Sequence, residues 1–197
     1  MIFNAPIIVK YVIEKLKNNG YEAYLVGGSV RDAIMGYDIT DYDVTTNASL
    51  EEIKLVFSSD KVKEYSNNKT LCVIKEREYV EVSSFKGNNI EEDLANRDFT
   101  INAIAYDLEQ IIDPFKGRVD LLNKIIRTPI DPKITITNDP LRMLRAIRFS
   151  GKYGFEIDKE LKNTMNECAN LFLTIKKDRI KIEFDKILVL DKPSIYI

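Results

Sequence analysis

Apolar positions along the chain switch between helical and strand-like spacing. In residues 6–19 they recur at helical intervals and Gly20 follows, which predicts an amphipathic helix and its C-terminal stop. Apolar or alternating runs at 21–28, 70–76 and 79–85 predict β-strands, and only a short turn separates the last two. We therefore expect an antiparallel hairpin from these two runs, within a part of the chain that mixes helices and strands.

Shorter patterns predict the elements between these strands. A helix is expected at 29–36, directly after a Gly-Gly pair, and a strand at 41–47, where valine and threonines alternate with polar residues. Ser49 and Glu52 have the spacing of a capping box at the start of a further helix. Residues 91–107 have a helical pattern. The first part of the chain therefore alternates between the two kinds of element.

The pattern becomes helical throughout in the last part of the chain. Three helices are expected within 139–154, 158–172 and 178–188, each with an Asp at or near its start, where a carboxylate can cap free amides. We therefore predict two domains: a mixed α/β domain at 1–137 and a helical domain at 138–197.

Composition narrows the class of protein. The chain has 197 residues, of which 45% are hydrophobic, and no apolar run is long enough to cross a membrane. Charged residues interrupt the first twenty positions, where a signal peptide would be apolar. Cys72 and Cys168 lie far apart in unrelated patterns, so we expect two reduced thiols. Together these features predict a cytoplasmic protein that does not contact membranes.

Histidine is absent from the sequence, which excludes Ser-His-Asp triads, histidine general bases and histidine-ligated zinc. Chemistry must rely on carboxylates, Lys, Arg, Tyr or backbone dipoles. The formal net charge of −2 argues weakly against a nucleic-acid partner. Between Arg142 and Lys186, however, there are eleven Lys and Arg residues but only seven Asp and Glu residues, so this segment can present a basic face.

One segment, VGGSVRDAIMGYDITDYDVTT at 26–46, concentrates candidate chemistry. Its two glycines, between a strand and a helix, let the backbone approach a phosphate, and Arg31 lies one turn into that helix. Asp41 and Asp43, two residues apart on the predicted strand, would project from one face and repel each other. A divalent cation such as Mg²⁺ relieves that repulsion. An isolated Asp-x-Asp is more often a solvated strand edge, so the glycines and Arg31 give the pair its significance.

The order Gly-Ser, spacer, Asp-x-Asp resembles the signature of the nucleotidyltransferase superfamily that includes DNA polymerase β. Four segments in the same order extend the resemblance to the class II tRNA nucleotidyltransferases, which are the CCA-adding and CC-adding enzymes, and to the bacterial poly(A) polymerases. These segments are 24–46, 91–107, 113–128 and 138–158. The resemblance implies an α+β fold, in which a polymerase-β-like head domain with a mixed sheet and flanking helices precedes a helical neck domain.

The resemblance also implies roles for the matching residues. Asp41 and Asp43 would hold Mg²⁺, and Glu81 would be a third catalytic carboxylate on a neighbouring strand, with an ordinary exposed strand residue as the alternative. The nucleotide would be bound by Gly28, Arg31, Arg97, Asp139, Arg142, Arg145 and Arg148.

Within that set, the glycine and Arg31 would hold the triphosphate, and Arg97 the sugar or phosphates. Asp139 and Arg142 would read the base, because their acceptors and donors can imitate a Watson–Crick partner. Arg145 and Arg148 would extend a basic stripe toward the phosphates or the RNA end. The alternatives are helix N-capping for Asp139 and a solvated helix face for the arginines.

The implied activity is the template-independent addition of C, with A left open, from CTP and ATP to the 3′ end of tRNA. The RNA 3′-hydroxyl would attack the α-phosphorus and release pyrophosphate, with metal ions and positioning supplying most of the rate. A poly(A) polymerase shares the same motifs and is the nearest alternative. An inert RNA- or nucleotide-binding remnant is the other, although it would not need the paired aspartates.

Three features depart from the family pattern. Asn138 replaces the usual Glu before Asp139, and Asn96 replaces the usual first Arg before Arg97. The connection at 86–90 is shorter than in most CCA-adding relatives, which favours C addition. Finally, only head and neck are recognisable. The body and tail domains that grip tRNA are not, so the alternatives are a compact enzyme, a fragment, or an assembly in which a second copy or a partner chain supplies them.

Overall fold

The computed structural model describes residues 5–65, 70–191 and 193. Its strands are β1 (Ala23–Val26), β2 (Asp43–Thr46), β3 (Lys61–Tyr65), β4 (Thr70–Lys75), β5 (Glu78–Ser84), β6 (Ala105–Tyr106), β7 (Ile111–Ile112), β8 (Ile125–Ile126) and β9 (Glu156–Ile157). Its α-helices are α1 (Ile7–Asn18), α2 (Gly28–Met35), α3 (Leu50–Val56), α4 (Ile90–Ala95), α5 (Gly117–Asn123), α6 (Pro132–Asn138), α7 (Arg142–Tyr153), α8 (Lys159–Glu167) and α9 (Lys177–Leu188). Within these ranges, no helix has the length and apolar character needed to span a membrane.

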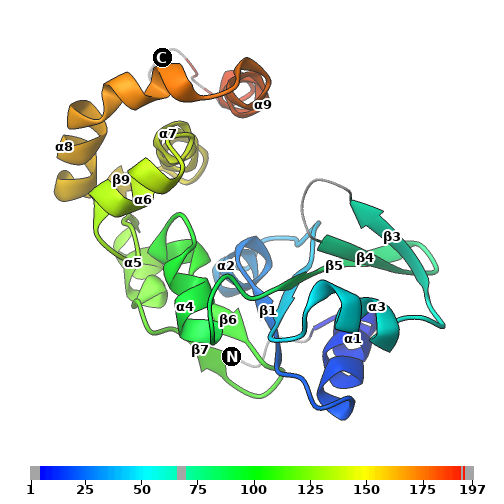
Figure 1. The fold of residues 1–197 in the computed structure, drawn as a ribbon. Helices are drawn as coiled ribbons and strands as arrows, with labels where there is room; N and C mark the ends of the chain where they lie inside the picture. Colours follow the sequence, from blue (N-terminus) through cyan, green and yellow to red (C-terminus); the bar gives the residue numbers. More distant parts are fainter. Residues whose placement is uncertain (1–4, 66–69, 192, 194–197) are drawn as a thin grey trace.

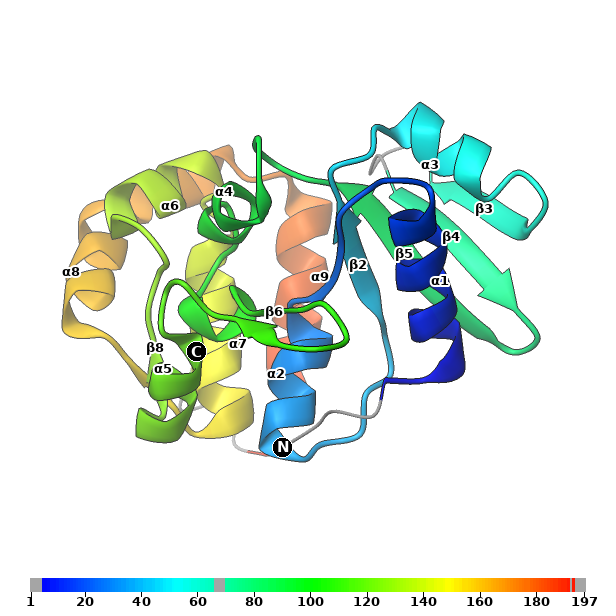
Figure 2. The same cartoon turned by 90° about the horizontal axis from the view of Figure 1, so that it is seen from below.

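Seven strands of the described chain form one sheet in the order β3-β4-β5-β2-β1-β6-β7. Neighbouring strands are antiparallel, except that β2 and β5 run parallel with Asp43 opposite Glu81. Helices α1 and α3 cover one face of the sheet (Figures 1 and 2). Val80 and Val82 point into that covered core, so Glu81 between them points to the opposite face. The mixed sheet with flanking helices confirms the predicted fold class.

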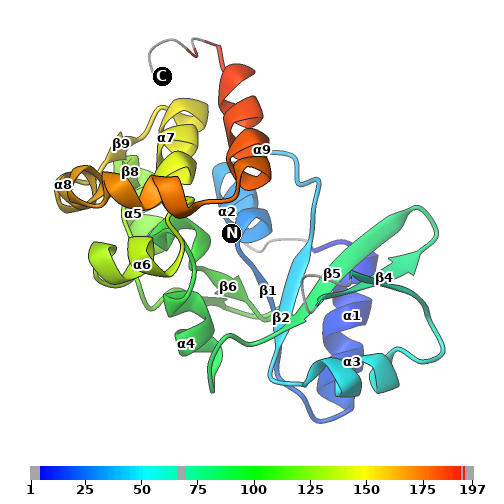
Figure 3. The same ribbon diagram turned by 45° about the horizontal axis from the view of Figure 1, so that its top comes forward.

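Helices α6 to α9 form the second part of the molecule. Helix α7 packs against α9, and α6 against α8, to one side of the sheet (Figures 1 and 3). Leu141, Leu144, Ile175 and Ile187 form a small apolar core of their own there. The domain boundary predicted between residues 137 and 138 falls in the last turn of α6.

Two elements predicted from neighbouring residues, the hairpin and the capping box, are confirmed. The predicted hairpin is present as β4 and β5. The capping box is complete, since the Ser49 side chain accepts from the Glu52 amide and the Glu52 side chain accepts from the Ser49 amide.

Two expectations were wrong. The second half of the predicted helix at 91–107 contains only a 3₁₀ turn at Thr100–Asn102, followed by strand β6. This stretch is buried on all sides, with Ile101 and Ile104 fully inaccessible, and a fully buried run has no period that separates helix from strand. The other error concerns Asp41, which precedes β2 instead of lying in it. The strand begins at Asp43.

Candidate active site

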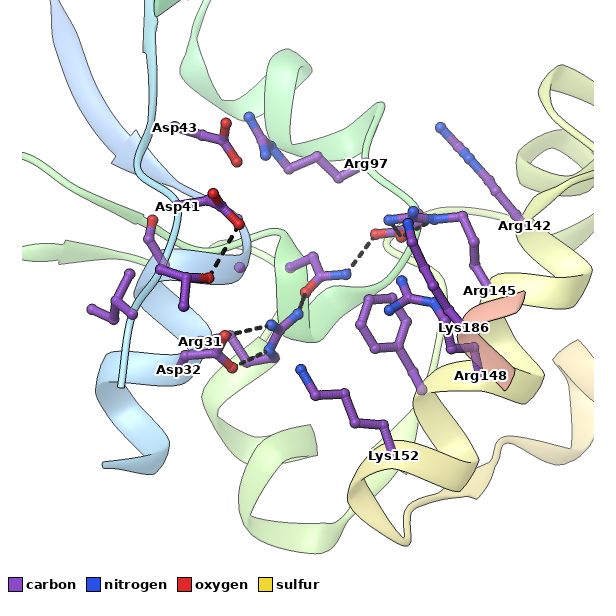
Figure 4. Close-up of a pocket in the computed structure, with 18 of the residues that line it drawn as sticks. Arg31, Asp32, Asp41, Asp43, Arg97, Arg142, Arg145, Arg148, Lys152 and Lys186 are labelled. Carbon is purple, nitrogen blue, oxygen red and sulfur yellow. Dashed lines mark hydrogen bonds and ion pairs between the residues drawn. The ribbon is translucent and has the colours of Figure 1, made fainter. Parts of the chain in front are cut away.

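A cleft of about 630 Å³ lies between the open side of the sheet and helices α7 and α9 (Figure 4). The predicted site residues that line it are Gly28, Arg31, Asp41, Asp43, Arg97, Asp139, Arg142, Arg145 and Arg148. Glu81 lines an adjoining cavity of about 450 Å³, which shares Asp43 and Arg97 with the cleft. The structure therefore gathers residues that are more than a hundred positions apart in the sequence.

The glycine turn brings backbone to the cleft. Gly27 has φ 74° and ψ −133°, a conformation that favours glycine, and a Cβ there would lie 2.9 Å from a guanidinium nitrogen of Arg97. Helix α2 begins at Gly28, and the Ser29 hydroxyl donates to the carbonyl of Val26 at 2.9 Å. The first amides of a helix have no partner within it, so this turn can present donors to an anion.

The acids Asp41, Asp43 and Glu81 lie close enough to influence one another. Burial raises the pKa of Asp43; the positive charge of Arg97 opposes this shift, and the negative charge of Asp41 adds to it. Burial also raises the pKa of Glu81, and the charges of Asp43 and Asp41 raise it further. These raised pKa values mark an unfavourable concentration of negative charge that a cation would relieve.

Their donor atoms fit a hard cation. Carboxylate oxygens suit Mg²⁺, which commonly takes one or two carboxylates and completes its shell with water and substrate phosphates. In the described part of the chain, no three His, Cys, Asp or Glu side chains are grouped so that they could hold a metal ion by themselves. A metal held here by Asp41 and Asp43 would therefore depend on oxygens from water or a bound nucleotide.

Arg31 is fixed from several sides. Its side chain is only 6% exposed and pairs with Asp32 at 2.8 Å. It also donates to Asn102, and its guanidinium lies 5.2 Å from the ring of Phe149 and 5.0 Å from that of Tyr153. The guanidinium lines the cleft in one fixed orientation, so the N–H groups that do not bind Asp32 or Asn102 can donate to a ligand.

Arg97 lies between the acids and the glycine turn. It pairs with the buried Asp93 at 3.0 Å. Its Nε atom is buried without a hydrogen-bond partner among the described residues. An unsatisfied buried donor is costly. Because this Nε atom is inaccessible, a ligand oxygen would have to meet Arg97 at its terminal nitrogens, one of which already donates to Asp93.

Asp139 and Arg142 lie at the junction of α6 and α7. Asp139 ends α6 and is not the N-cap of α7, which is Leu141, although its carboxylate accepts the Leu141 amide at 3.3 Å. The other carboxylate oxygen of Asp139 pairs with Arg179 of α9 at 2.8 Å. Arg142 donates to the backbone carbonyls of Thr135 and Asn96, so its guanidinium is held despite Asn138.

Arg145 and Arg148 lie on α7 and line the cleft with Arg142, where the basic stripe was expected, but both are paired with acids of this chain. Arg145 pairs with Asp98 at 2.6 Å and with Glu183 at 3.5 Å. Arg148 Nε lies 2.7 Å from Glu183 Oε2, as an ion pair without hydrogen-bond alignment. Much of their charge is therefore neutralised within the chain, which periodicity alone could not reveal.

Sequence reasoning missed the two acids that neutralise them. Asp98 is 7% exposed; burial alone would raise its pKa, but Arg145 and hydrogen bonds from Asn102, Arg145 and the Phe99 amide hold that pKa below its ordinary value. Glu183 is 4% exposed. It lies three residues after Ile180 and four before Ile187, both on the core side of α9. A charge at a core-facing position was the available signal.

The chain matches two family models. The first, described as the Poly A polymerase head domain, matches residues 23–127. The second, described as the probable RNA and SrmB-binding site of polymerase A, matches residues 154–197.

Curated relatives and solved structures agree with these matches. The chain is 39% identical over 194 residues to a CCA-adding enzyme of Geobacillus sp. (strain WCH70), covering 90% of this chain and 48% of the relative. It is 37% identical over 184 residues to a CC-adding tRNA nucleotidyltransferase of Shouchella clausii, covering 89% and 46%. The Bacillus stearothermophilus CCA-adding enzyme in complex with CTP superposes with a TM-score of 0.88 at 35% identity, covering 94% of this chain and 49% of that one. The chain thus spans about half the length of these relatives.

Proposed function

Because this chain belongs to the poly(A) polymerase head-domain family, we propose that it acts as a template-independent RNA nucleotidyltransferase. In this proposal it adds C from CTP to the 3′ end of tRNA, and incubation of CC-ended tRNA with ATP decides whether it also adds A. The relatives named above include both CCA-adding and CC-adding enzymes.

One observation carries the proposal. A single cleft collects a glycine turn, two aspartates and several arginines from both parts of the molecule. Figure 4 shows Asp41 and Asp43 on one side of this cleft and the arginines of α7 on the other. The two ends of a nucleoside triphosphate need these two kinds of group. Its phosphates bind cations and backbone donors, and its base binds paired donors and acceptors.

In the proposed reaction, the RNA 3′-hydroxyl oxygen forms a bond to the α-phosphorus while the bond from that phosphorus to the bridging oxygen of pyrophosphate breaks. Asp41 and Asp43 would hold Mg²⁺, and the chemistry a bound cation would supply is a lowered pKa for the attacking hydroxyl and stabilisation of charge on the leaving oxygens. The proton of the hydroxyl passes to solvent or to Glu81, whose raised pKa makes it a better base than an ordinary carboxylate.

The remaining residues bind and orient the nucleotide. Gly28 and Arg31 hold the triphosphate, and Arg97, which lines the cleft, donates to the sugar or a phosphate through its terminal guanidinium nitrogens. Asp139 and Arg142 contact the base edge. The short connection between β5 and α4, at residues 85–89, supports C addition over A addition.

The test uses three tRNA transcripts that end at the discriminator base, at C and at CC. The purified chain and Mg²⁺ are supplied with labelled CTP or ATP separately, and products are resolved to one nucleotide. An Asp41→Asn, Asp43→Asn double variant serves as the inactive control.

The products distinguish the alternatives. Two C additions without A support a CC-adding enzyme, and A addition to the CC-ended transcript extends the proposal to complete CCA synthesis. Long A tails would instead assign a poly(A) polymerase. If CTP binds but no transcript is extended, this chain by itself is not the proposed enzyme: it is either an inert binding module or a part that needs a partner chain to grip tRNA.

A further inference from the structure

A tyrosine that no sequence pattern singled out contacts one of the two proposed metal ligands. The Tyr79 hydroxyl donates a hydrogen bond to Asp41 Oδ1 at 2.6 Å. Because Asp43 lies opposite Glu81 in the parallel pair of β2 and β5, the residues two positions upstream, Asp41 and Tyr79, are also neighbours on the same face. Tyr79 therefore belongs to the polar patch that carries the three acids.

Asp41 needs such support more than Asp43 does. Asp43 is the first residue of β2, whereas Asp41 is exposed in the irregular segment between α2 and β2. The last backbone bond at this end of the ladder runs from the Glu81 amide to the Tyr42 carbonyl at 2.9 Å. The backbone of Asp41 itself is thus outside the sheet.

Two hydroxyls fix the Asp41 carboxylate instead. Tyr79 binds Oδ1, and the Thr40 hydroxyl donates to Oδ2 at 3.1 Å. An ionised carboxylate has about four acceptor sites, so both oxygens keep capacity to bind a cation. Of the two donors, Tyr79 is the one that comes from the sheet, and it ties Asp41 to the strand that carries Glu81.

We propose that Tyr79 is a positioning residue, which holds Asp41 in the orientation that lets it share a divalent cation with Asp43. Tyr79 does not touch the reacting atoms and acts only through Asp41. The inference rests on the metal site of the proposed function. Partners that orient a metal ligand typically account for ten- to a hundredfold in metal affinity or activity.

The test compares Tyr79→Phe with Tyr24→Phe. Tyr24 is a matched control, because it also lies on the sheet and its hydroxyl also donates to a carboxylate, that of Glu22, at 2.9 Å. The whole chain is titrated with Mn²⁺ alone, and unbound Mn²⁺ is followed by electron paramagnetic resonance. A second measurement gives the Mg²⁺ concentration at which CTP incorporation is half-maximal. This concentration does not depend on the fraction of the protein that is folded.

We expect Tyr79→Phe to weaken Mn²⁺ binding about tenfold or more and to raise the half-maximal Mg²⁺ concentration similarly. The maximal rate at saturating Mg²⁺ and the KM for CTP should stay near wild type, and Tyr24→Phe should change nothing. Equal Mn²⁺ affinity in wild type and Tyr79→Phe, or equal weakening by both substitutions, overturns the role of Tyr79.

A third variant separates this result from failure of the proposed function. Asp43→Asn should remove the Mn²⁺ site in either background. If wild type binds no Mn²⁺, or if its Mn²⁺ binding survives Asp43→Asn, the metal site and the role of Tyr79 are both wrong. If Asp43→Asn abolishes binding and Tyr79→Phe leaves it unchanged, only the inference about Tyr79 is wrong.

Discussion

Two groups of charged side chains at the cleft differ in how their charges are paired. In the first, which we call the sheet wall, the carboxylates of Asp41 and Asp43 line the cleft and lie near Glu81 in the adjoining cavity. In the second, which we call the helix wall, Arg145 and Arg148 line the cleft and are paired with Glu183. Burial raises the pKa values of Asp43 and Glu81, and the neighbouring carboxylates raise them further. Across the cleft, Glu183 contacts both arginines, and Asp98 contacts Arg145.

This difference separates two uses of charge. The sheet wall keeps an unfavourable arrangement that a bound cation relieves, which is typical of a site built for chemistry. The helix wall uses the same kinds of residues to join elements: Asp98 precedes the 3₁₀ turn below the cleft, Arg145 and Arg148 lie on α7, and Glu183 lies on α9. Its ion pairs hold the shape of the cleft more than they supply free charge.

The largest effect is expected from removing the sheet wall. Asp41→Ala combined with Asp43→Ala should abolish nucleotide incorporation, since the cation's contribution of several kcal/mol to the transition state corresponds to about a thousandfold or more in rate. Thermal unfolding should show a fold as stable as wild type, because the substitution removes repulsion. Extension of RNA at an appreciable rate by the double variant would contradict the metal assignment.

The helix wall should respond in the opposite way, with a loss of stability. Glu183→Ala leaves Arg145 and Arg148 facing each other without their common carboxylate, and breaking a largely buried ion pair costs about 3 kcal/mol. Asp185→Ala, two residues along the same helix, removes only an exposed pair with Lys181 and should leave the unfolding midpoint unchanged. Urea unfolding of the two variants measures the contrast, and equal midpoints would mean that Glu183 is not structural.

The same contrast shows what the sequence could predict. The glycine turn and the paired aspartates are local, because residue type and spacing define them within about twenty positions, and the structure places them in the cleft as expected. The capping box at Ser49 was recognisable for the same reason. Short-range chemistry leaves a short-range pattern.

Ion pairs between residues far apart in the sequence leave no such pattern. Arg145 meets an acid 47 positions away and another 38 positions away, and a helical repeat gives the face of a residue but not the partner across it. Helix N-capping was the alternative role for Asp139, yet α6 continues up to this residue and α7 begins later, because tertiary packing decides where one helix stops and the next begins. Arg179 and Tyr79 were missed because their partners come from other elements.

Acidification should distinguish the two walls. In the metal-free protein, the raised pKa values of Asp43 and Glu81 mean that these groups take up protons above the ordinary carboxyl range near pH 4. Protons therefore compete with the proposed cation on acidification, and activity falls without loss of stability. Asp98 has a lowered pKa, so its stabilising charge is complete above that range and is lost only as the pH falls below it. Activity should therefore fall at a higher pH than the unfolding midpoint does.

Arg97 sharpens this pH experiment. Its charge opposes the raised pKa of Asp43, so Arg97→Gln should move the acidic limb of the rate profile to higher pH, while Arg97→Lys, which keeps the charge, should move it less. Rate profiles and unfolding midpoints measured across the same pH series provide the comparison. Activity and stability that decline together on acidification would show that protonation acts on the fold and not on the sheet wall.

The smallest effect concerns Arg179, whose half-exposed pair with Asp139 is worth about 1 kcal/mol or less. Asp139 accepts the Leu141 amide on one oxygen and Arg179 on the other, so Arg179 reduces the acceptor capacity and negative charge that the proposed site leaves for a base. Arg179→Gln should therefore lower the KM for CTP by up to about fivefold, with kcat and stability unchanged. Lys181→Gln, on the same helix and paired with Asp185, should leave KM as it is. A KM for CTP that rises in Arg179→Gln would contradict this prediction. Arg179 would then bind the nucleotide itself, and its charge would serve a ligand and not only the ion pair with Asp139.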